Sequence, residues 1–270
     1  SSDLAIGGTH AWDGTKIGAG QMQHAAMVEG ERVDILLTFL RPFKSKADVS
    51  FAFKDASAEA SSGAPTATEV TWSMQAKMPI FMRPFIPMLA MMIGHDFALG
   101  LGFLRGKIDP ASEHPKLKFE GEQQVPSQLY LTEHFEGTLE AMRGVMFEAY
   151  PRLWSLVEPD PSRNVAAPAI AAYHKIKPLK GTVKMDMGMP VSRIKQGEQS
   201  ATFGAGRYFV TTLKGNYDFI GSAWNAAYGQ AKMSKLKIDK RRPALEIYDV
   251  NPMQATHSND WTTRLCVPIK

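Results

Sequence analysis

Cysteine and long apolar runs are both scarce in this 270-residue sequence. A single cysteine, Cys266, excludes an internal disulfide framework and every zinc cluster built on cysteines. The most apolar stretch, residues 78–104, is interrupted by Arg83, His95 and Asp96 and offers no unbroken run of the roughly 20 residues that a membrane span needs. A buried helix is therefore predicted there. The polar amino terminus has no signal-peptide pattern, which favours a cytoplasmic location.

Charge of one sign is also lacking, because 31 basic residues face 27 acidic ones. This balance, together with the absence of a helix-turn-helix pattern, predicts no direct nucleic-acid partner. The seven histidines have no metal-site spacing, and the sequence contains no phosphate-binding loop, dinucleotide fingerprint or nucleophile elbow. We therefore expect no metal and no cofactor. With 44% hydrophobic residues the chain is nevertheless globular.

Strands dominate the first part of the chain. Residues 33–39, 49–53 and 70–74 alternate apolar with polar or smaller side chains, which is typical of half-buried antiparallel strands. The apolar helix follows them. Residues 109–127 are polar and contain Pro110, Pro115 and Pro126, so we predict a linker at 111–124, between a first domain at 1–110 and a second at 125–270.

The second domain contains an internal repeat, with copies at about 125–192 and 203–270. Tyr130 and Tyr208 occupy equivalent positions at the start of the two copies. Each copy is predicted to form a strand, an amphipathic helix and two further strands. Two such copies would pair into one sheet with both helices on the same face. The predicted fold class is α+β.

This pattern resembles the GyrI-like small-molecule-binding domain, the effector-binding module of multidrug-responsive transcription activators. The resemblance spans about 124–270 and is carried by Gly215-Asn216-Tyr217, Trp224, Leu245-Glu246-Ile247-Tyr248, Asn251-Pro252 and Val267-Pro268-Ile269. It implies a groove between the two repeats that binds a hydrophobic or amphipathic small molecule as sensor, carrier or sequestering protein.

The first domain resembles the START-like polyketide-cyclase (SRPBCC) superfamily. The residues that carry this resemblance are Trp12-Asp13-Gly14, Gly18-Ala19-Gly20, Val70-Thr71-Trp72-Ser73-Met74, Gly94-His95-Asp96-Phe97, Gly100-Leu101 and Leu104. The resemblance implies an antiparallel sheet with one long carboxy-terminal helix, here without the opening elements of the family. Lipid or polyketide binding by this domain is one alternative function. Some relatives carry an upstream membrane helix, and membrane contact is expected only through such a segment.

Glu246 is the residue most strongly expected at the ligand site. On a strand it shares one face with Tyr248, while Leu245 and Ile247 share the other. If Leu245 and Ile247 pack on the helices, Glu246 and Tyr248 face the ligand groove. The alternative is a solvent-exposed glutamate on an edge strand. Its counterpart in the first copy is Ala171, so the groove would have one carboxylate. The full set of expected ligand contacts is Glu246, Tyr248, Tyr173, Trp224, Tyr208, Tyr217 and Arg264. Tyr208, Tyr217 and Trp224 could instead fill the core between the helices and the sheet.

Two questions stay open at this point. Arg264 could pair with Glu246, form a separate anion-binding group that favours neutral or acidic ligands, or lie on the surface. The protein could also be a hydrolase of reactive electrophilic small molecules, as some GyrI-like relatives are. Glu246 would then be the base and Tyr248 or Tyr173 the proton donor. An Arg264–Glu246 pair would lower the pKa of Glu246 and weaken that alternative.

Overall fold

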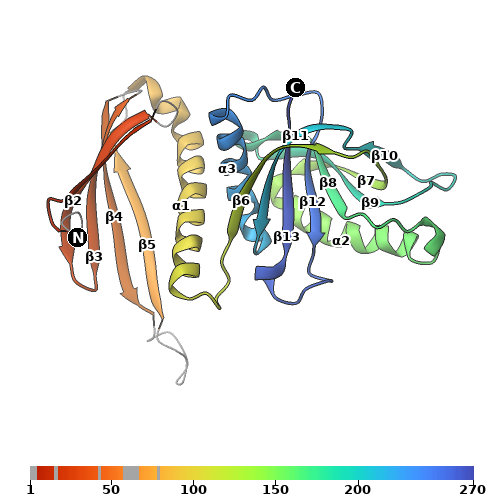
Figure 1. Ribbon diagram of the computed structural model, residues 1–270, viewed down its shortest axis with the longest axis horizontal. Helices are drawn as coiled ribbons and strands as arrows, with labels where there is room; N and C mark the ends of the chain where they lie inside the picture. Colours follow the sequence, from red (N-terminus) through yellow and green to blue (C-terminus); the bar gives the residue numbers. More distant parts are fainter. Residues whose placement is uncertain (1–4, 15–17, 42–43, 57–66, 78–79) are drawn as a thin grey trace. The chain divides into compact units, whose positions relative to one another are not determined.

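The computed structural model describes residues 5–14, 18–41, 44–56, 67–77 and 80–270 (Figure 1). Residues 78–79, where the apolar stretch begins, lie outside this part. The chain divides into two units, Ser1–Ala90 and Met91–Lys270. Both contain antiparallel sheets, and the second adds two helices that cover one sheet face, so the predicted α+β class is confirmed.

The first unit contains a five-stranded antiparallel sheet in which each strand pairs with the next. Its strands are β1 (Thr9–Gly14), β2 (Gly18–Val28), β3 (Arg32–Arg41), β4 (Ser45–Asp55) and β5 (Thr68–Ala76). The three strands predicted from alternation correspond to β3, β4 and β5. One sheet face is aromatic, since Phe51 and Trp72 are cross-strand partners with ring centroids 4.8 Å apart. The START-like resemblance of this part stays a prediction.

The predicted long helix is present as α1 (Ile86–Ile108), which follows a short 3₁₀ turn, η3 (Ile80–Phe85). By length and composition alone, the helical stretch Met82–Ile108 is apolar enough to cross a membrane, with a mean hydropathy of 1.4. All of α1 is described, and only Leu99 and Gly102 in it are buried. The helix thus forms where the sequence predicts it, but the burial expected for it is limited to these two residues.

The second unit contains an eight-stranded sheet in the order β10-β7-β9-β8-β12-β13-β11-β6. The strands are β6 (Lys116–Val125), β7 (Gln128–Thr138), β8 (Ala169–Lys177), β9 (Thr182–Pro190), β10 (Ser200–Phe203), β11 (Gly206–Lys214), β12 (Ala244–Val250) and β13 (Thr262–Pro268). The helices are α2 (Leu139–Val157) and α3 (Ile220–Met233), and the short 3₁₀ turns are η4 (Pro161–Arg163), η5 (Pro178–Lys180), η6 (Tyr217–Phe219) and η7 (Ser258–Asp260). Each copy therefore has the predicted order of strand, helix, strand and strand.

The two copies meet along β8 and β12, where Glu246 pairs in register with its counterpart Ala171. The pseudo-twofold axis consequently passes between these two residues. Two strands that the sequence did not predict lie at the ends of the sheet. The strand before the first copy, β6, pairs with β11 of the second copy, and β10 pairs with β7 of the first copy. The copies are thus joined at the axis and at both ends of the sheet.

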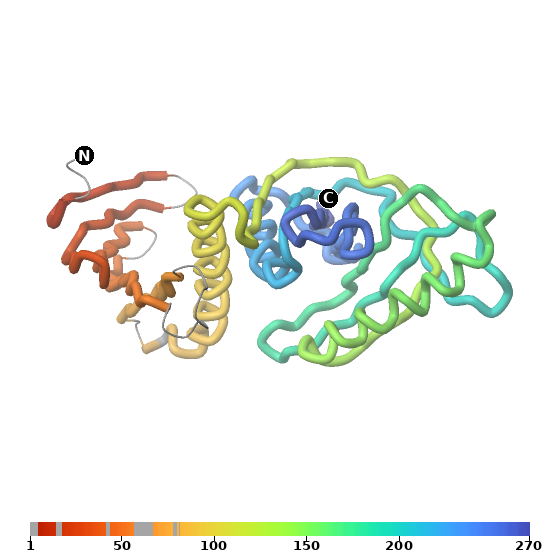
Figure 2. The backbone as a smooth tube through the Cα atoms, turned by 90° about the horizontal axis from the view of Figure 1, so that it is seen from below, coloured from red at the N-terminus to blue at the C-terminus, as the bar shows by residue number. Residues whose placement is uncertain are grey.

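Both helices cover the same side of the sheet, as predicted, and we call this side the helix face (Figures 1 and 2). Met185, Met187 and Tyr248 of the sheet pack there beneath α2. We call the opposite side the inner face. Its apolar cluster contains Val125 and Phe203, which come from the two end strands, so the sheet curls around this face.

Candidate functional site

Glu246 lies in the middle of the helix face, with only 2% of its surface exposed. The prediction that it shares a strand face with Tyr248 is confirmed by their direct contact. The condition that Leu245 and Ile247 pack on the helices is not met, because both belong to the cluster on the inner face. Glu246 and Tyr248 point toward the helices instead, and the space between the helices and the sheet becomes the candidate site.

Three hydrogen-bond donors surround the Glu246 carboxylate. Nε1 of Trp224, from α3, donates to Oε1 over 2.6 Å, and the Tyr248 hydroxyl donates to Oε2 over 2.6 Å. The Tyr173 hydroxyl, from the first copy, is a third hydrogen-bond partner. Both repeats therefore contribute to one carboxylate, and these donors offset part of the cost of burying it.

Further aromatic rings enclose this group. The ring of Tyr150, from α2, contacts that of Tyr248 edge to face at 5.8 Å, and the Tyr150 hydroxyl donates to the carbonyl of Ile170 over 2.7 Å. Tyr217 lies 5.8 Å from Tyr248 and 5.0 Å from Trp261, measured between ring centroids.

The buried surroundings change the proton affinity of the site. Burial raises the pKa of Glu246, and the hydrogen bonds from Tyr248, Trp224 and Tyr173 oppose part of that rise. Burial, reinforced by the nearby Glu246 carboxylate, also raises the pKa values of Tyr248 and Tyr173 well above 10. Both phenols therefore stay protonated at neutral pH and act as donors toward Glu246.

Around this centre lies an open groove of about 2080 Å³ between α2, α3 and the sheet. Its wall from α2 is apolar, with Met146 and Tyr150 toward the floor and Phe147 and Trp154 more exposed. At one rim an ion pair joins Arg143 of α2 to Asp218 near the start of α3. The other described groups at the rims include Lys175, His174, Lys240, Asp239 and Asn251.

Five of the seven expected ligand contacts, all but Tyr208 and Arg264, line this groove. Tyr208 belongs to the inner-face cluster, beneath the guanidinium of Arg242 at 4.8 Å. Arg264 pairs in register with Ile247 of the inner face and forms a two-pronged ion pair with Asp249, at 2.6 and 2.7 Å. The structure thus separates these two residues from Glu246, and Arg264 does not pair with Glu246.

Two lining residues, Tyr150 and Trp261, were not expected at the site. The repeat alignment identifies Tyr150 as the counterpart of Tyr228, but it does not show that the ring of Tyr150 contacts Tyr248. Trp261 is held by a hydrogen bond from Nε1 to the carbonyl of Ala255, over 2.8 Å. It comes from the segment before β13, and the helix and strand periodicities say nothing about such a segment.

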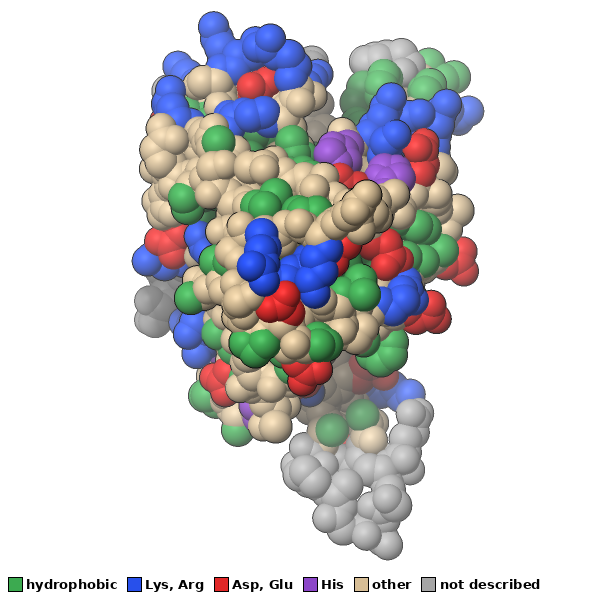
Figure 3. Space-filling view, turned by 90° about the vertical axis from the view of Figure 1, so that its right-hand side faces the viewer, with side chains coloured by type: hydrophobic (Ala, Val, Ile, Leu, Met, Phe, Trp, Pro, Cys, Tyr) green, Lys and Arg blue, Asp and Glu red, His purple; other side chains and the backbone are tan. Residues whose placement is uncertain are grey.

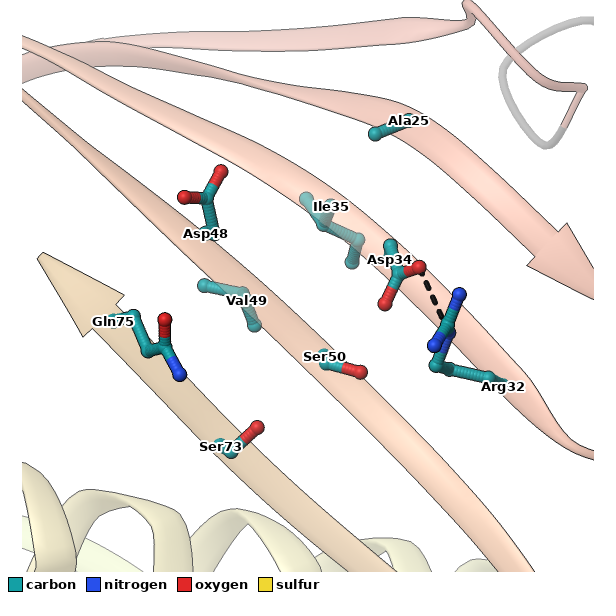
Figure 4. A pocket seen from close by; sticks show the side chains of 9 residues that line it. All are labelled: Ala25, Arg32, Asp34, Ile35, Asp48, Val49, Ser50, Ser73 and Gln75. Atoms are coloured by element: carbon teal, nitrogen blue, oxygen red, sulfur yellow. Dashed lines mark ion pairs between the residues drawn. The ribbon is translucent and has the colours of Figure 1, made fainter.

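A second hollow, of about 410 Å³, lies on the polar face of the five-stranded sheet (Figure 4). Asp48, Ser50, Ser73 and Gln75 line it, and an ion pair of 2.9 Å joins Arg32 and Asp34 at its edge. Its polar lining residues are all at least partly exposed. In the part of the chain that the structure describes, no three His, Cys, Asp or Glu residues are placed to hold a metal ion.

Comparison with known proteins yields several similar structures and one family. The EcmrR–DNA complex is 12% identical with a TM-score of 0.48, covering 71% of each chain. SAV2435 bound to tetraphenylphosphonium is 14% identical with a TM-score of 0.41, covering 58% of this chain and 94% of that one. A hydrolase encoded by lin2189 of Listeria innocua is 12% identical with a TM-score of 0.36, covering 62% and 98%.

No functionally curated protein matches the sequence. The profile of the GyrI-like small molecule binding domain matches residues 122–270, which is more than half of the chain.

Proposed function

Because the chain belongs to the GyrI-like small-molecule-binding family over residues 122–270, we propose that it binds a hydrophobic or amphipathic small molecule between α2 and α3. The observation that carries this proposal is the buried Glu246 carboxylate on the floor of a groove walled by aromatic rings. An ionisable group without a charged partner is costly to bury, and such groups concentrate at functional sites. Glu246, Tyr248, Tyr173, Trp224 and Tyr217 are the proposed ligand contacts.

The geometry indicates how a ligand would be held. Apolar parts would pack against Met146, Tyr150 and Trp224, and a ligand donor or cation would take the place of one protein donor on Glu246. The groove is larger than the roughly 300–1,000 Å³ typical of small-molecule pockets, which favours an elongated ligand or one that fills only the centre. Arg264 is paired with Asp249 on the other sheet face, so the anion-binding role considered for it has no part in this proposal.

A binding assay tests the proposal. Trp224 and Trp261 line the groove, so ligands can be titrated by quenching of tryptophan fluorescence, with hydrophobic amines, neutral aromatics and aromatic acids as the panel. Glu246→Gln should weaken an amine by about tenfold to a hundredfold, as expected for a lost hydrogen bond to a charged group, and leave a neutral aromatic unchanged. Glu148→Gln removes an exposed carboxylate from α2 and should change neither.

Failure would be visible in two ways. The proposal is wrong if no class of compound quenches the fluorescence of the folded protein. It is also wrong if Glu246→Gln and Glu148→Gln bind every compound with the same affinity as the unmodified chain.

Hydrolysis of a reactive electrophile is the second candidate function, favoured by one observation. Burial raises the pKa of Glu246, and no arginine pairs with it to lower that value. Glu246 would accept a proton from water as the water oxygen attacks the electrophilic carbon, and Tyr173 would donate a proton to the leaving group. Turnover abolished by Glu246→Gln, with binding retained, would support an enzyme. Binding of the same compounds without turnover would contradict it.

A further inference from the structure

The turn between β8 and β9 combines exposed lysines with exposed aliphatic side chains. We call residues 175–181, with the sequence KIKPLKG, the β8–β9 tip. Lys175, Lys177 and Lys180 in it are all exposed. Between them, Ile176 is 41% and Leu179 is 66% exposed. The exposed side chains of Ile176 and Leu179 therefore contribute little to the packing of this unit.

The shape of the tip is fixed by local structure. Pro178 begins the short turn η5, and Gly181 ends it with a left-handed φ of 62°. The Gly181 carbonyl accepts a hydrogen bond of 2.8 Å from the amide of Leu139, at the start of α2. Figure 2 shows this turn at the outside of the unit, beside the beginning of α2. The β8–β9 tip therefore projects from the sheet in a conformation that this turn and this hydrogen bond fix.

The charge of the tip is not neutralised by neighbours. Lys184, on the adjoining strand, pairs with Glu136 at 3.3 Å. In the described part of the chain, no ion pair involves Lys175, Lys177 or Lys180. The register of β8 and β12 pairs Tyr173 with Ala244, which brings the segment just before β12, with exposed Lys240, to the same end of the sheet. Basic side chains are not confined to the tip, because Figure 3 shows Lys and Arg side chains both at the upper edge and at the centre of the face drawn there.

From this combination we propose that the β8–β9 tip docks on an anionic phospholipid surface, with the lysines at the headgroups and Leu179 inserted between them. Lysines near an anionic leaflet are attracted to it, and aliphatic side chains gain by leaving water for the acyl boundary. A nucleic acid would use the lysines and leave Leu179 and Ile176 in water. A lipid surface accounts for both the exposed lysines and the exposed aliphatic side chains, whereas the phosphate backbone of a nucleic acid accounts for the lysines alone.

Docking would also place the groove near the lipid, because Lys175, Ile176 and Pro178 line both the tip and the groove. An amphipathic ligand would then pass between the bilayer and Glu246 without crossing bulk water. This consequence rests on the proposed function, whereas the docking itself does not. Glu246→Gln should therefore leave docking unchanged even where it removes ligand binding.

Co-sedimentation of the full chain with vesicles tests the docking. Vesicles of phosphatidylcholine alone are compared with vesicles that also contain phosphatidylserine, at about 0.1 M and about 1 M salt. We expect binding only to the anionic vesicles, and loss of it at high salt. The triple variant Lys175→Gln/Lys177→Gln/Lys180→Gln should bind on the order of a hundredfold more weakly, at about fivefold per lysine. Leu179→Ser should also weaken binding, with the charge unchanged.

The matched control removes the same charge elsewhere. Lys107, Lys116 and Lys214 are exposed, and Lys116 and Lys214 lie at the opposite end of the sheet. Their triple change to Gln should leave vesicle binding within about twofold. Equal weakening by both triple variants would show an effect of net charge alone and overturn the proposal. So would vesicle binding that survives in the tip variants, or binding to duplex DNA by a chain that ignores the vesicles.

Discussion

Replacing Trp224 by phenylalanine tests the central contact of the site, the hydrogen bond from its indole nitrogen to Glu246. The bond is 2.6 Å long, and its acceptor is a carboxylate with 2% of its surface exposed. Phenylalanine keeps an aromatic ring near Tyr173 and Tyr228, whose centroids lie 6.2 and 5.7 Å from that of Trp224. The substitution therefore removes the donor and retains most of the packing.

The expected loss of stability follows from these contacts. A buried hydrogen bond to a charged group contributes about 2 kcal/mol, and the smaller ring loses about 1 kcal/mol of apolar burial, for a total of roughly 3 kcal/mol. For a unit of this size that corresponds to a melting temperature lower by roughly 10 °C. In a Glu246→Gln background the acceptor is uncharged, so the same substitution should cost about 1 kcal/mol less.

Four proteins are unfolded in urea at neutral pH: the unmodified chain, Trp224→Phe, Glu246→Gln and the double variant. Their unfolding free energies give the coupling energy between positions 224 and 246 directly. Trp154→Phe is the control, because Trp154 is 41% exposed and its ring nitrogen has no hydrogen bond among those that the structure describes. It should change the unfolding free energy by less than about 0.5 kcal/mol. The reasoning is refuted if Trp224→Phe costs no more than this control, or costs the same with Glu246 and with Gln at position 246.

Three further predictions concern other buried groups. Burial raises the folded-state pKa of Glu246, so its contribution to stability is fully present below pH 4.5 and is lost as the pH rises through the folded value. The urea midpoint of Glu246→Gln, taken relative to that of the unmodified chain, should therefore rise between about pH 4 and about pH 8. A difference between the two midpoints that stays constant over this range would contradict the prediction. Glu198 pairs with the fully buried Arg163 at 2.5 Å. Glu198→Gln should thus cost about 3 kcal/mol in urea unfolding, against less than about 0.5 for Glu148→Gln, and equal costs would refute the burial argument. Burial raises the pKa of Cys266 to about 12, so the folded protein should not react with a thiol reagent until it unfolds, and rapid reaction without denaturant would contradict the structure.

Local periodicity was enough to predict most of the fold. The alternation in 33–39 and the helical spacing of Leu139 and Met142 are local patterns, and the structure has β3 and α2 there. The edge strands β6 and β10 were missed, because each is defined by a partner in the other copy and β6 lies largely within a polar, proline-containing segment. Long-range pairing of this kind leaves little signal in the sequence of either strand.

The site was predicted less completely than the fold. Strand alternation correctly grouped Glu246 with Tyr248, but it cannot decide which of two sheet faces meets the helices when both are apolar. The packing of Leu245 and Ile247 on the helices could therefore be stated from the sequence only as a condition, and both residues lie on the inner face. Arg264 and Tyr208 were among the expected ligand contacts, whereas the register puts Arg264 beside Ile247 on the inner face and Tyr208 belongs to the cluster there.

The register of Glu246 opposite Ala171 has a consequence for how such a site can arise. In a symmetrical dimer of one copy, the residue at this position would face its own duplicate across the axis. A glutamate there would place two buried glutamates opposite each other, with their Cα atoms about 5 Å apart, and an alanine would leave no carboxylate. Joining the copies in one chain frees the two positions to differ. A solitary acid at the centre of a near-symmetrical site is therefore a property that a dimer of identical copies cannot have.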